Sequence, residues 1–101
     1  MFKKIVSVDY TGMIPEVKEA LNELAEEVIY YDDYPKNNEE IIRRVKDADV
    51  ILVSWNTKID KEVIDSCPNL KYVGMCCSLI DENSANVAIK ACRERNLWYN
   101  I

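Results

Sequence analysis

The chain has 101 residues, 49% of them hydrophobic and 31% charged, a composition typical of one globular domain and not of a disordered chain. Its net charge of -5 and isoelectric point near 4.7 argue against nucleic acid or an anionic membrane surface as the main partner, because both need clustered basic side chains. No apolar run approaches the roughly 18 residues of a membrane-spanning helix, and the amino terminus lacks the apolar core of a signal peptide. We therefore expect a cytoplasmic protein.

The first part of the chain combines two runs of strand character with one helical segment. Residues 4–8 predict a strand, and Gly12 in the loop that follows allows a tight turn. Pro15 suits the first turn of a helix. Apolar residues then recur at positions i, i+3, i+4 and i+7, which predicts an amphipathic helix: Val17, Ala20, Leu21 and Leu24. Residues 27–31 are mostly β-branched or aromatic and predict a second strand.

The middle of the chain predicts a helix followed by one strand-helix-strand unit. The helix is expected from Asn38 to about Lys46. The run Val50–Val53 is apolar at every position, as in a strand that is buried on both faces of a parallel sheet. Asp60 can cap the next helix, and Pro68 prevents that helix from continuing. A further strand is expected from Leu70 onward.

The last part predicts one more helix and one more strand. Small residues recur on one face of the helix: Ala85, Ala88, Ala91 and Cys92. Residues 97–101 predict a fifth strand. The alternation of strands and helices with short loops predicts an α/β fold, a flavodoxin-like doubly wound five-stranded parallel sheet that forms a single three-layer domain over residues 1–101.

The ends of the two central strands are the expected binding site. Parallel strand ends joined by a helix lie side by side, and ligands of open α/β sheets bind at that carboxyl edge. The candidate binding residues follow these two strands: Trp55, Asn56, Thr57, Cys77, Ser78 and Leu79. A large aromatic side chain such as Trp55 beside a strand end usually covers a ligand or another domain.

Several kinds of chemistry are disfavoured. The chain has no histidine, so it cannot form a Ser-His-Asp or Cys-His arrangement. Four cysteines, at positions 67, 76, 77 and 92, fit neither a zinc ribbon nor a redox spacing, and we interpret them as buried free thiols. The acidic pairs at positions 32 and 33 and at positions 47 and 49 are more typical of solvated carboxylates than of a metal site.

Two other classes of protein share the expected fold, and the characteristic site of each can be compared with this sequence. A phosphoreceiver domain carries its phosphorylated aspartate at the end of the third strand, where this chain has Ser54. A flavodoxin holds the phosphate of its flavin in a hydroxyl-rich loop after the first strand, and here residues 9–13 contain only Thr11 and Gly12 of such a loop. The sequence therefore favours neither of these functions.

The central stretch resembles the first domain of the NAD-dependent D-isomer-specific 2-hydroxyacid dehydrogenases. Three segments carry the resemblance: Ala48–Val53, Thr57–Ile64 and Cys67–Gly74. In that family the loop after the fourth strand reads Gly-x-x-Gly-x-Gly-x-Asp. Here Gly74 and Asp81 match this pattern, whereas Cys77 and Leu79 stand at glycine positions and are expected to reshape the approach to the substrate carboxylate.

The resemblance implies a substrate-side domain of an oxidoreductase that acts on a D-2-hydroxy acid. It implies a following Rossmann domain that binds NAD(H) or NADP(H), and that domain, with the catalytic residues, is lacking from these 101 residues. We therefore expect no cofactor in this chain, no turnover by it as an isolated fragment, and a homodimer that covers its exposed apolar surface. The alternative is a stand-alone flavodoxin-like binding or interaction module.

Overall fold

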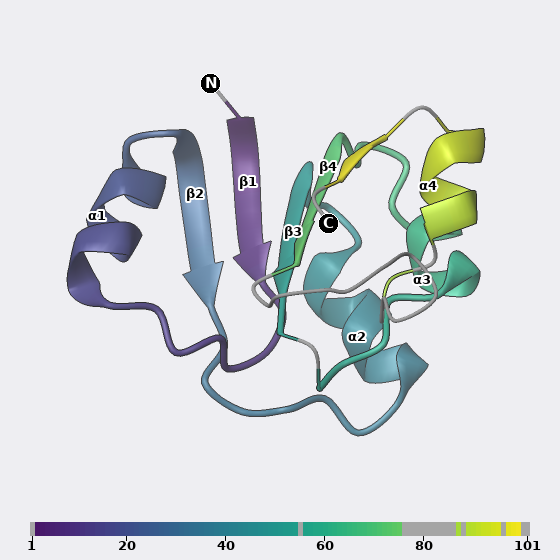
Figure 1. Cartoon of the computed structure of the whole chain (residues 1–101), viewed down its shortest axis with the longest axis horizontal. Coiled ribbons are helices and arrows are strands. Elements are labelled where there is room, and N and C mark those ends of the chain that lie inside the picture. The colour runs from purple at the N-terminus through teal and green to yellow at the C-terminus, as the bar shows by residue number, and fades with distance from the viewer. Residues whose placement is uncertain (1, 55, 76–86, 88, 96, 100–101) are drawn as a thin grey trace.

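The computed structural model describes residues 2–54, 56–75, 87, 89–95 and 97–99, in which strands and helices alternate along the chain (Figure 1). The strands are β1 (Phe2–Ser7), β2 (Ala25–Tyr30), β3 (Val50–Val53), β4 (Tyr72–Met75) and β5 (Trp98–Tyr99). The helices are α1 (Pro15–Asn22), α2 (Asn38–Val45), α3 (Lys61–Asp65) and α4 (Ile89–Glu94). The predicted α/β architecture is confirmed.

The strands form one sheet in the order β2-β1-β3-β4-β5, and every neighbouring pair is parallel. The chain leaves β1 toward one side of the sheet to form β2, and it leaves β3 toward the other side to form β4. The carboxyl ends of β1 and β3 are therefore neighbours at the point where the direction of winding changes. This point is the usual ligand crevice of an open α/β sheet.

One face of the sheet is covered by α2, α3 and α4, which lie together on the same side of the strands (Figure 1). Alternate residues of the central strands point into this layer, among them Val6, Ile51 and Val73, none of which has exposed surface. They pack on Val45 of α2 and Val63 of α3. The strand Val50–Val53 has the predicted bounds, and three of its four residues are buried, whereas Leu52 is only half-buried.

The caps of α2 and α3 follow from short polar side chains. The Asn37 side chain accepts a hydrogen bond from the amide of Glu40 at 2.9 Å, so α2 begins one residue later. The Asp60 carboxylate accepts one from the amide of Val63 at 3.2 Å, which confirms the predicted cap of α3. The Asn38 side chain also donates to Asp60 at 2.8 Å and ties the two helix starts together.

The other face of the sheet is contacted by α1. No residue of α1 is buried, and only Leu21 packs against the small cluster around Ile5, Ala25 and Val50. The predicted helix is present, and Val17 in its apolar stripe is 43% exposed. The helix contacts the edge strand β2 and lies at that edge of the sheet, away from β3 and β4 (Figure 1).

The amino-terminal edge of the sheet is held by Asp49, which is 4% exposed. Its carboxylate accepts hydrogen bonds from the amides of Lys3 at 2.9 Å and Lys4 at 2.7 Å, and its backbone carbonyl accepts from the amides of Lys71 and Tyr72. One residue before β3 therefore ties together the starts of β1 and β4. We interpret Asp49 as a structural residue, because its oxygen atoms are satisfied by backbone amides.

The thiols described by the structure are buried, as the sequence predicted. Cys67 and Cys92 are free cysteines without exposed surface. The Cys67 thiol donates to the carbonyls of Val63 at 3.3 Å and Val45 at 3.4 Å. Burial raises the pKa of the Cys67 thiol to about 11. Cys76 and Cys77 lie outside the described residues.

We expect the stability of the protein to fall as the pH rises from about 9 to about 11. In this range the unfolded Cys67 thiol loses its proton while the buried one keeps it, so the unfolded state binds fewer protons and gains stability. Urea denaturation at pH 8 and pH 10.5 measures this effect. A Cys67→Ala variant is the control, and it should lose less stability over the same range than the unmodified protein. Equal losses would contradict the assignment.

Candidate functional site

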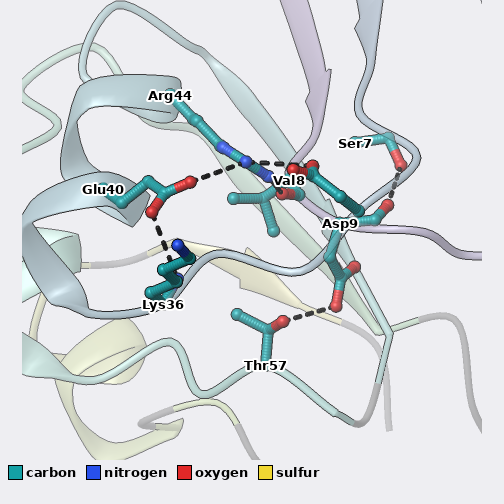
Figure 2. Close-up of polar contacts among 8 residues, drawn as sticks. Ser7, Val8, Asp9, Lys36, Glu40, Arg44 and Thr57 are labelled. Atoms are coloured by element: carbon teal, nitrogen blue, oxygen red, sulfur yellow. Dashed lines mark hydrogen bonds and ion pairs between the residues drawn. The ribbon is translucent and has the colours of Figure 1, made fainter.

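The carboxyl edge of the sheet is organised by Asp9, which follows β1 and has no exposed surface. Its carboxylate accepts hydrogen bonds from the Ser54 amide at 2.9 Å, the Ser54 hydroxyl at 2.6 Å and the Thr57 hydroxyl at 2.5 Å. Figure 2 shows the Thr57 hydroxyl facing this carboxylate. Three donors from one loop thus satisfy a carboxyl group that has no exposed surface.

The loop between β3 and α3 is fixed at both of its ends. At its start, the Ser54 hydroxyl also accepts a hydrogen bond from the Asn56 amide at 3.2 Å, which makes a tight local turn. At its end, Ile59 is fully buried and forms an isolated parallel bridge with Val87. The exposed Asn56 lies between these anchors. The loop therefore presents a polar side chain from a fixed backbone.

A second polar cluster at the same edge is centred on Arg44 of α2, whose side chain is only 8% exposed. Its guanidinium donates to the carbonyl of Val8 at 2.9 Å and forms ion pairs with Glu40 and Asp33, both at 2.9 Å. It also lies 4.2 Å from the ring centre of Tyr31. Figure 2 shows the Arg44 side chain reaching toward the end of β1. Arg44 thus joins α2 to the ends of β1 and β2.

In the part of the chain that the structure describes, a cavity lies at each of two opposite edges of the sheet. The smaller one, about 150 Å³, lies at the carboxyl edge and is lined by the loop after β1 and by residues at the end of β2. The larger one, about 360 Å³, lies at the amino edge beside Asp49. We take the carboxyl edge as the candidate site despite the difference in volume, because the strand ends and the loop after β3 converge there and the Asp49 carboxylate is already engaged by backbone amides.

The structure describes two of the six predicted site residues. Asn56 is exposed at the carboxyl edge, where a ligand could reach it. Thr57 is only 5% exposed, and its hydroxyl is directed to Asp9. The other four lie outside the described residues: Trp55, Cys77, Ser78 and Leu79.

Two of the four acidic residues considered for metal binding have other partners. Asp33 pairs with Arg44, and the Asp49 carboxylate accepts two backbone amides. Within the part of the chain that the structure describes, no group of three or more histidine, cysteine or acidic side chains could hold a metal ion. In the same residues, no helix has the length and apolar character needed to cross a membrane.

The sequence did not single out Asp9 or Arg44. A weak signal for Asp9 existed, because an acidic residue directly after a buried strand must either reach solvent or find donors. Its donors come from residues 45 and 48 positions away, and no local pattern indicates them. Arg44 lies among the charged residues of an amphipathic helix, and nothing in its spacing distinguishes it from Arg43.

A parallel α/β sheet with a fixed polar loop at its carboxyl edge is the architecture of a small-molecule or nucleotide-binding enzyme domain. Comparison with known families makes this specific. The chain matches the model of the D-isomer specific 2-hydroxyacid dehydrogenase catalytic domain over residues 6–99, and it belongs to that family. The family resemblance drawn from the sequence is confirmed.

Individual relatives agree with this assignment. A glyoxylate reductase of Thermofilum pendens is 38% identical over 65 residues, which are 62% of this chain and 19% of that protein. The solved structure of an acyclic imino acid reductase in complex with NADPH and D-Arg has a TM-score of 0.77 at 27% identity, over 95% of this chain and 29% of that one. NAD+-bound 3-phosphoglycerate dehydrogenase of Entamoeba histolytica has a TM-score of 0.74 at 27% identity, over 98% of this chain and 32% of that one. The chain thus spans about a fifth of the curated relative and about three tenths of the solved ones.

Proposed function

We propose that this chain is the substrate-side domain of an oxidoreductase that acts on a D-2-hydroxy acid or the corresponding 2-oxo acid with a nicotinamide cofactor. The observation that carries this proposal is the match to the catalytic domain of the D-isomer specific 2-hydroxyacid dehydrogenases over residues 6–99. The Thermofilum pendens relative is a glyoxylate reductase, which supports a small 2-oxo acid as the substrate class.

We further propose that the domain has flavodoxin-like winding and that its substrate meets the edge shared by β3 and β4. The strand order β2-β1-β3-β4-β5 supports this winding. The exposed Asn56 supports the position of the site, since it follows β3 on a loop that is fixed at both ends. The predicted contacts at Trp55, Cys77, Ser78 and Leu79 are part of this proposal, whereas Thr57 contributes by anchoring the loop.

A titration followed by backbone NMR tests the site. Glyoxylate added to the isolated 101-residue chain should shift the amide signals of Asn56 and of the residues that follow β4, and should leave those of Lys71 and Asp49 at the opposite edge unchanged. We expect weak binding, in the millimolar range or about 4 kcal/mol, because only one side of the site is present. Acetate is the matched control, since it has the carboxylate and lacks the 2-oxo group. Shifts confined to the amino edge would contradict the proposal and would favour a different binding module.

We propose that the nicotinamide cofactor is held by a separate Rossmann domain. The two related structures named above contain NADPH and NAD+, respectively. The 101 residues contain two glycines, too few for the Gly-x-Gly-x-x-Gly loop that receives a dinucleotide pyrophosphate at a helix start.

The isolated chain is expected not to bind NADH tightly. Calorimetric titration should give a dissociation constant no lower than about 1 mM, or no saturable heat. The NAD+-binding relative from Entamoeba histolytica, measured under the same conditions, is the positive control. A micromolar dissociation constant for the isolated chain would mean that these residues contain a nucleotide site. The proposal that a separate domain binds the cofactor would then be wrong.

We also propose that the isolated chain forms a homodimer through the sheet face beside α1. Exposed apolar residues gather on this helix and its flanks: Ile14, 57% exposed, Val17, 43%, and Leu24, 51%. Next to them, Phe2, Leu52 and Tyr72 are only half-buried. Apolar surface of this kind favours self-association.

Sedimentation velocity at micromolar concentration should give a mass near twice 11.7 kDa. A Val17→Lys variant should shift the distribution toward monomer, because it places a charge in the apolar patch. A Glu19→Lys variant, changed on the same helix, is the control and should leave the dimer intact. A monomer that persists at all concentrations would refute this part of the proposal.

A further inference from the structure

The crevice between β1 and β3 is the default ligand site of this fold, because the chain winds away from it in both directions. In this protein the Asp9 side chain spans the ends of these two strands. It belongs to the residue after Val8, whose amide pairs with Leu52 of β3 at 2.9 Å, and it reaches across to Ser54. A carboxylate and the hydroxyls bound to it therefore occupy the place where a ligand would enter.

The three donors to the Asp9 carboxylate described above all come from the loop that follows β3. One carboxylate oxygen accepts the Ser54 amide, and the other accepts the hydroxyls of Ser54 and Thr57 at 2.6 and 2.5 Å. The Ser54 hydroxyl in turn accepts the amide of Asn56. A continuous chain of hydrogen bonds thus runs from the end of β1 to the exposed residue of the proposed site.

The burial of Asp9 makes these hydrogen bonds costly to break. A carboxyl group without exposed surface that loses its donors is left unsatisfied, which is strongly destabilising. Conformations of the loop that break these bonds are therefore disfavoured. The backbone of Asn56 is held in one place before any ligand arrives, which is the requirement for a pre-formed site.

We propose that Asp9 is a positioning residue that closes the crevice between β1 and β3 and fixes the loop after β3, so that a 2-oxo acid is directed to the edge shared by β3 and β4. This inference rests on the proposed function. Asp9 acts through Ser54 and Thr57, and its buried carboxylate is kept from direct contact with the substrate.

The test compares Thr57→Val, which removes one donor to Asp9 at nearly constant volume, with Thr57→Ser, which keeps the hydroxyl. Amide hydrogen exchange in the loop, at Asn56 and Lys58, should become about tenfold faster or more in Thr57→Val, as expected from the loss of a hydrogen bond to a buried carboxyl group. Exchange at Ile51 in the neighbouring strand should stay unchanged. Thr57→Ser should restore the slow exchange, which a loss of packing alone would not allow.

Asp9→Asn tests the carboxyl group itself, and Asp32→Asn, an exposed aspartate at the end of β2, is its control. Asp9→Asn should speed exchange in the loop and weaken the glyoxylate-induced shifts of Asn56, whereas Asp32→Asn should do neither. If Asp9→Asn fails to fold, the comparison of Thr57→Val with Thr57→Ser still tests the inference. Unchanged loop exchange in Thr57→Val would overturn the inference. A protein whose loop loosens as described, but which binds no glyoxylate even without substitutions, would support Asp9 as the anchor of the loop and refute the proposed substrate.

Discussion

Replacement of Arg44 by methionine is expected to lower the free energy of unfolding by about 3 kcal/mol. Methionine can fill much of the space of the aliphatic part of the Arg44 side chain. The lost free energy of unfolding therefore measures the contribution of the guanidinium group. Without it, the carbonyl of Val8 loses its donor, and Glu40 and Asp33 face each other at the end of the sheet with no cation between them. The ring of Tyr31 also loses its charged neighbour.

Urea denaturation of Arg44→Met and Arg43→Met measures this effect. Arg43 is the preceding residue of the same helix and is exposed, so its substitution makes the same change of charge and length at a solvated position. It should cost no more than about 0.5 kcal/mol. Similar midpoints for the two variants would mean that the contacts of Arg44 contribute little, as is common for surface ion pairs.

Replacement of Asp49 by alanine is expected to cost a similar amount, about 2 to 3 kcal/mol, at the opposite edge of the sheet. The amides of Lys3 and Lys4 would lose a carboxylate that now accepts both of them, at 2.9 and 2.7 Å. The start of β1 would then be held against β3 by fewer hydrogen bonds. We expect the loss of protection to be largest in the amides of β1.

The control is Asp47→Ala, two residues earlier, where the aspartate is exposed. Its unfolding free energy should stay within about 0.5 kcal/mol of the unmodified protein. An Asp49→Asn variant should fall between the two, since an amide oxygen can accept from one of the two backbone donors. Equal stability of Asp49→Ala and Asp47→Ala would contradict the structural role assigned to Asp49.

The strand-helix-strand unit in the middle of the chain was predicted well because its signals are local. Four apolar residues define β3, Asp60 caps α3 through its own side chain, and Pro68 follows the end of that helix. Each signal acts within a few residues, so the sequence contains both the cause and the effect. The parallel arrangement of the strands then follows from the helix that connects them.

The burial of α1 could not be predicted in the same way. Helical spacing at Val17 and Leu21 indicates that a helix has an apolar stripe, and it does not indicate what covers that stripe. In the structure only Leu21 packs on the sheet, and Val17 stays exposed. A helix at the edge of a sheet contacts one strand and needs a further element, or a second chain, to cover the rest of its apolar side.

The candidate binding site stays a prediction, and the structure shows only where Asn56 and Thr57 lie. The topology placed Asn56 at the carboxyl edge correctly, because strand ends in a parallel sheet meet there. The sequence treated Thr57 as a contact for substrate, whereas its hydroxyl is engaged by Asp9, 48 residues earlier. Pairing across such a distance is decided by the register of β1 against β3, which a sequence pattern does not contain.

The two edges of the sheet thus use buried carboxylates in different ways. Asp49 satisfies backbone amides and holds strands together, which is a role in stability. Asp9 satisfies a loop amide and two hydroxyls, and so it fixes the backbone on which a ligand would rest. Substitution of Asp49 should therefore lower the free energy of unfolding without changing amide exchange in the loop after β3, whereas Thr57→Val should speed exchange in that loop.

The most direct test of the proposed function is the stereospecific oxidation of 2-hydroxy acids by the protein expressed from its complete natural reading frame. NAD+ and NADP+ would be offered in turn with the D and L isomers of lactate, glycerate and 3-phosphoglycerate, and reduction of the cofactor would be followed by absorbance. Membership of the D-isomer specific family leads us to expect turnover of at least one D isomer, and none of its L counterpart. Turnover of L isomers would contradict the proposed function. A failure of every one of these acids to reduce the cofactor would contradict it as well.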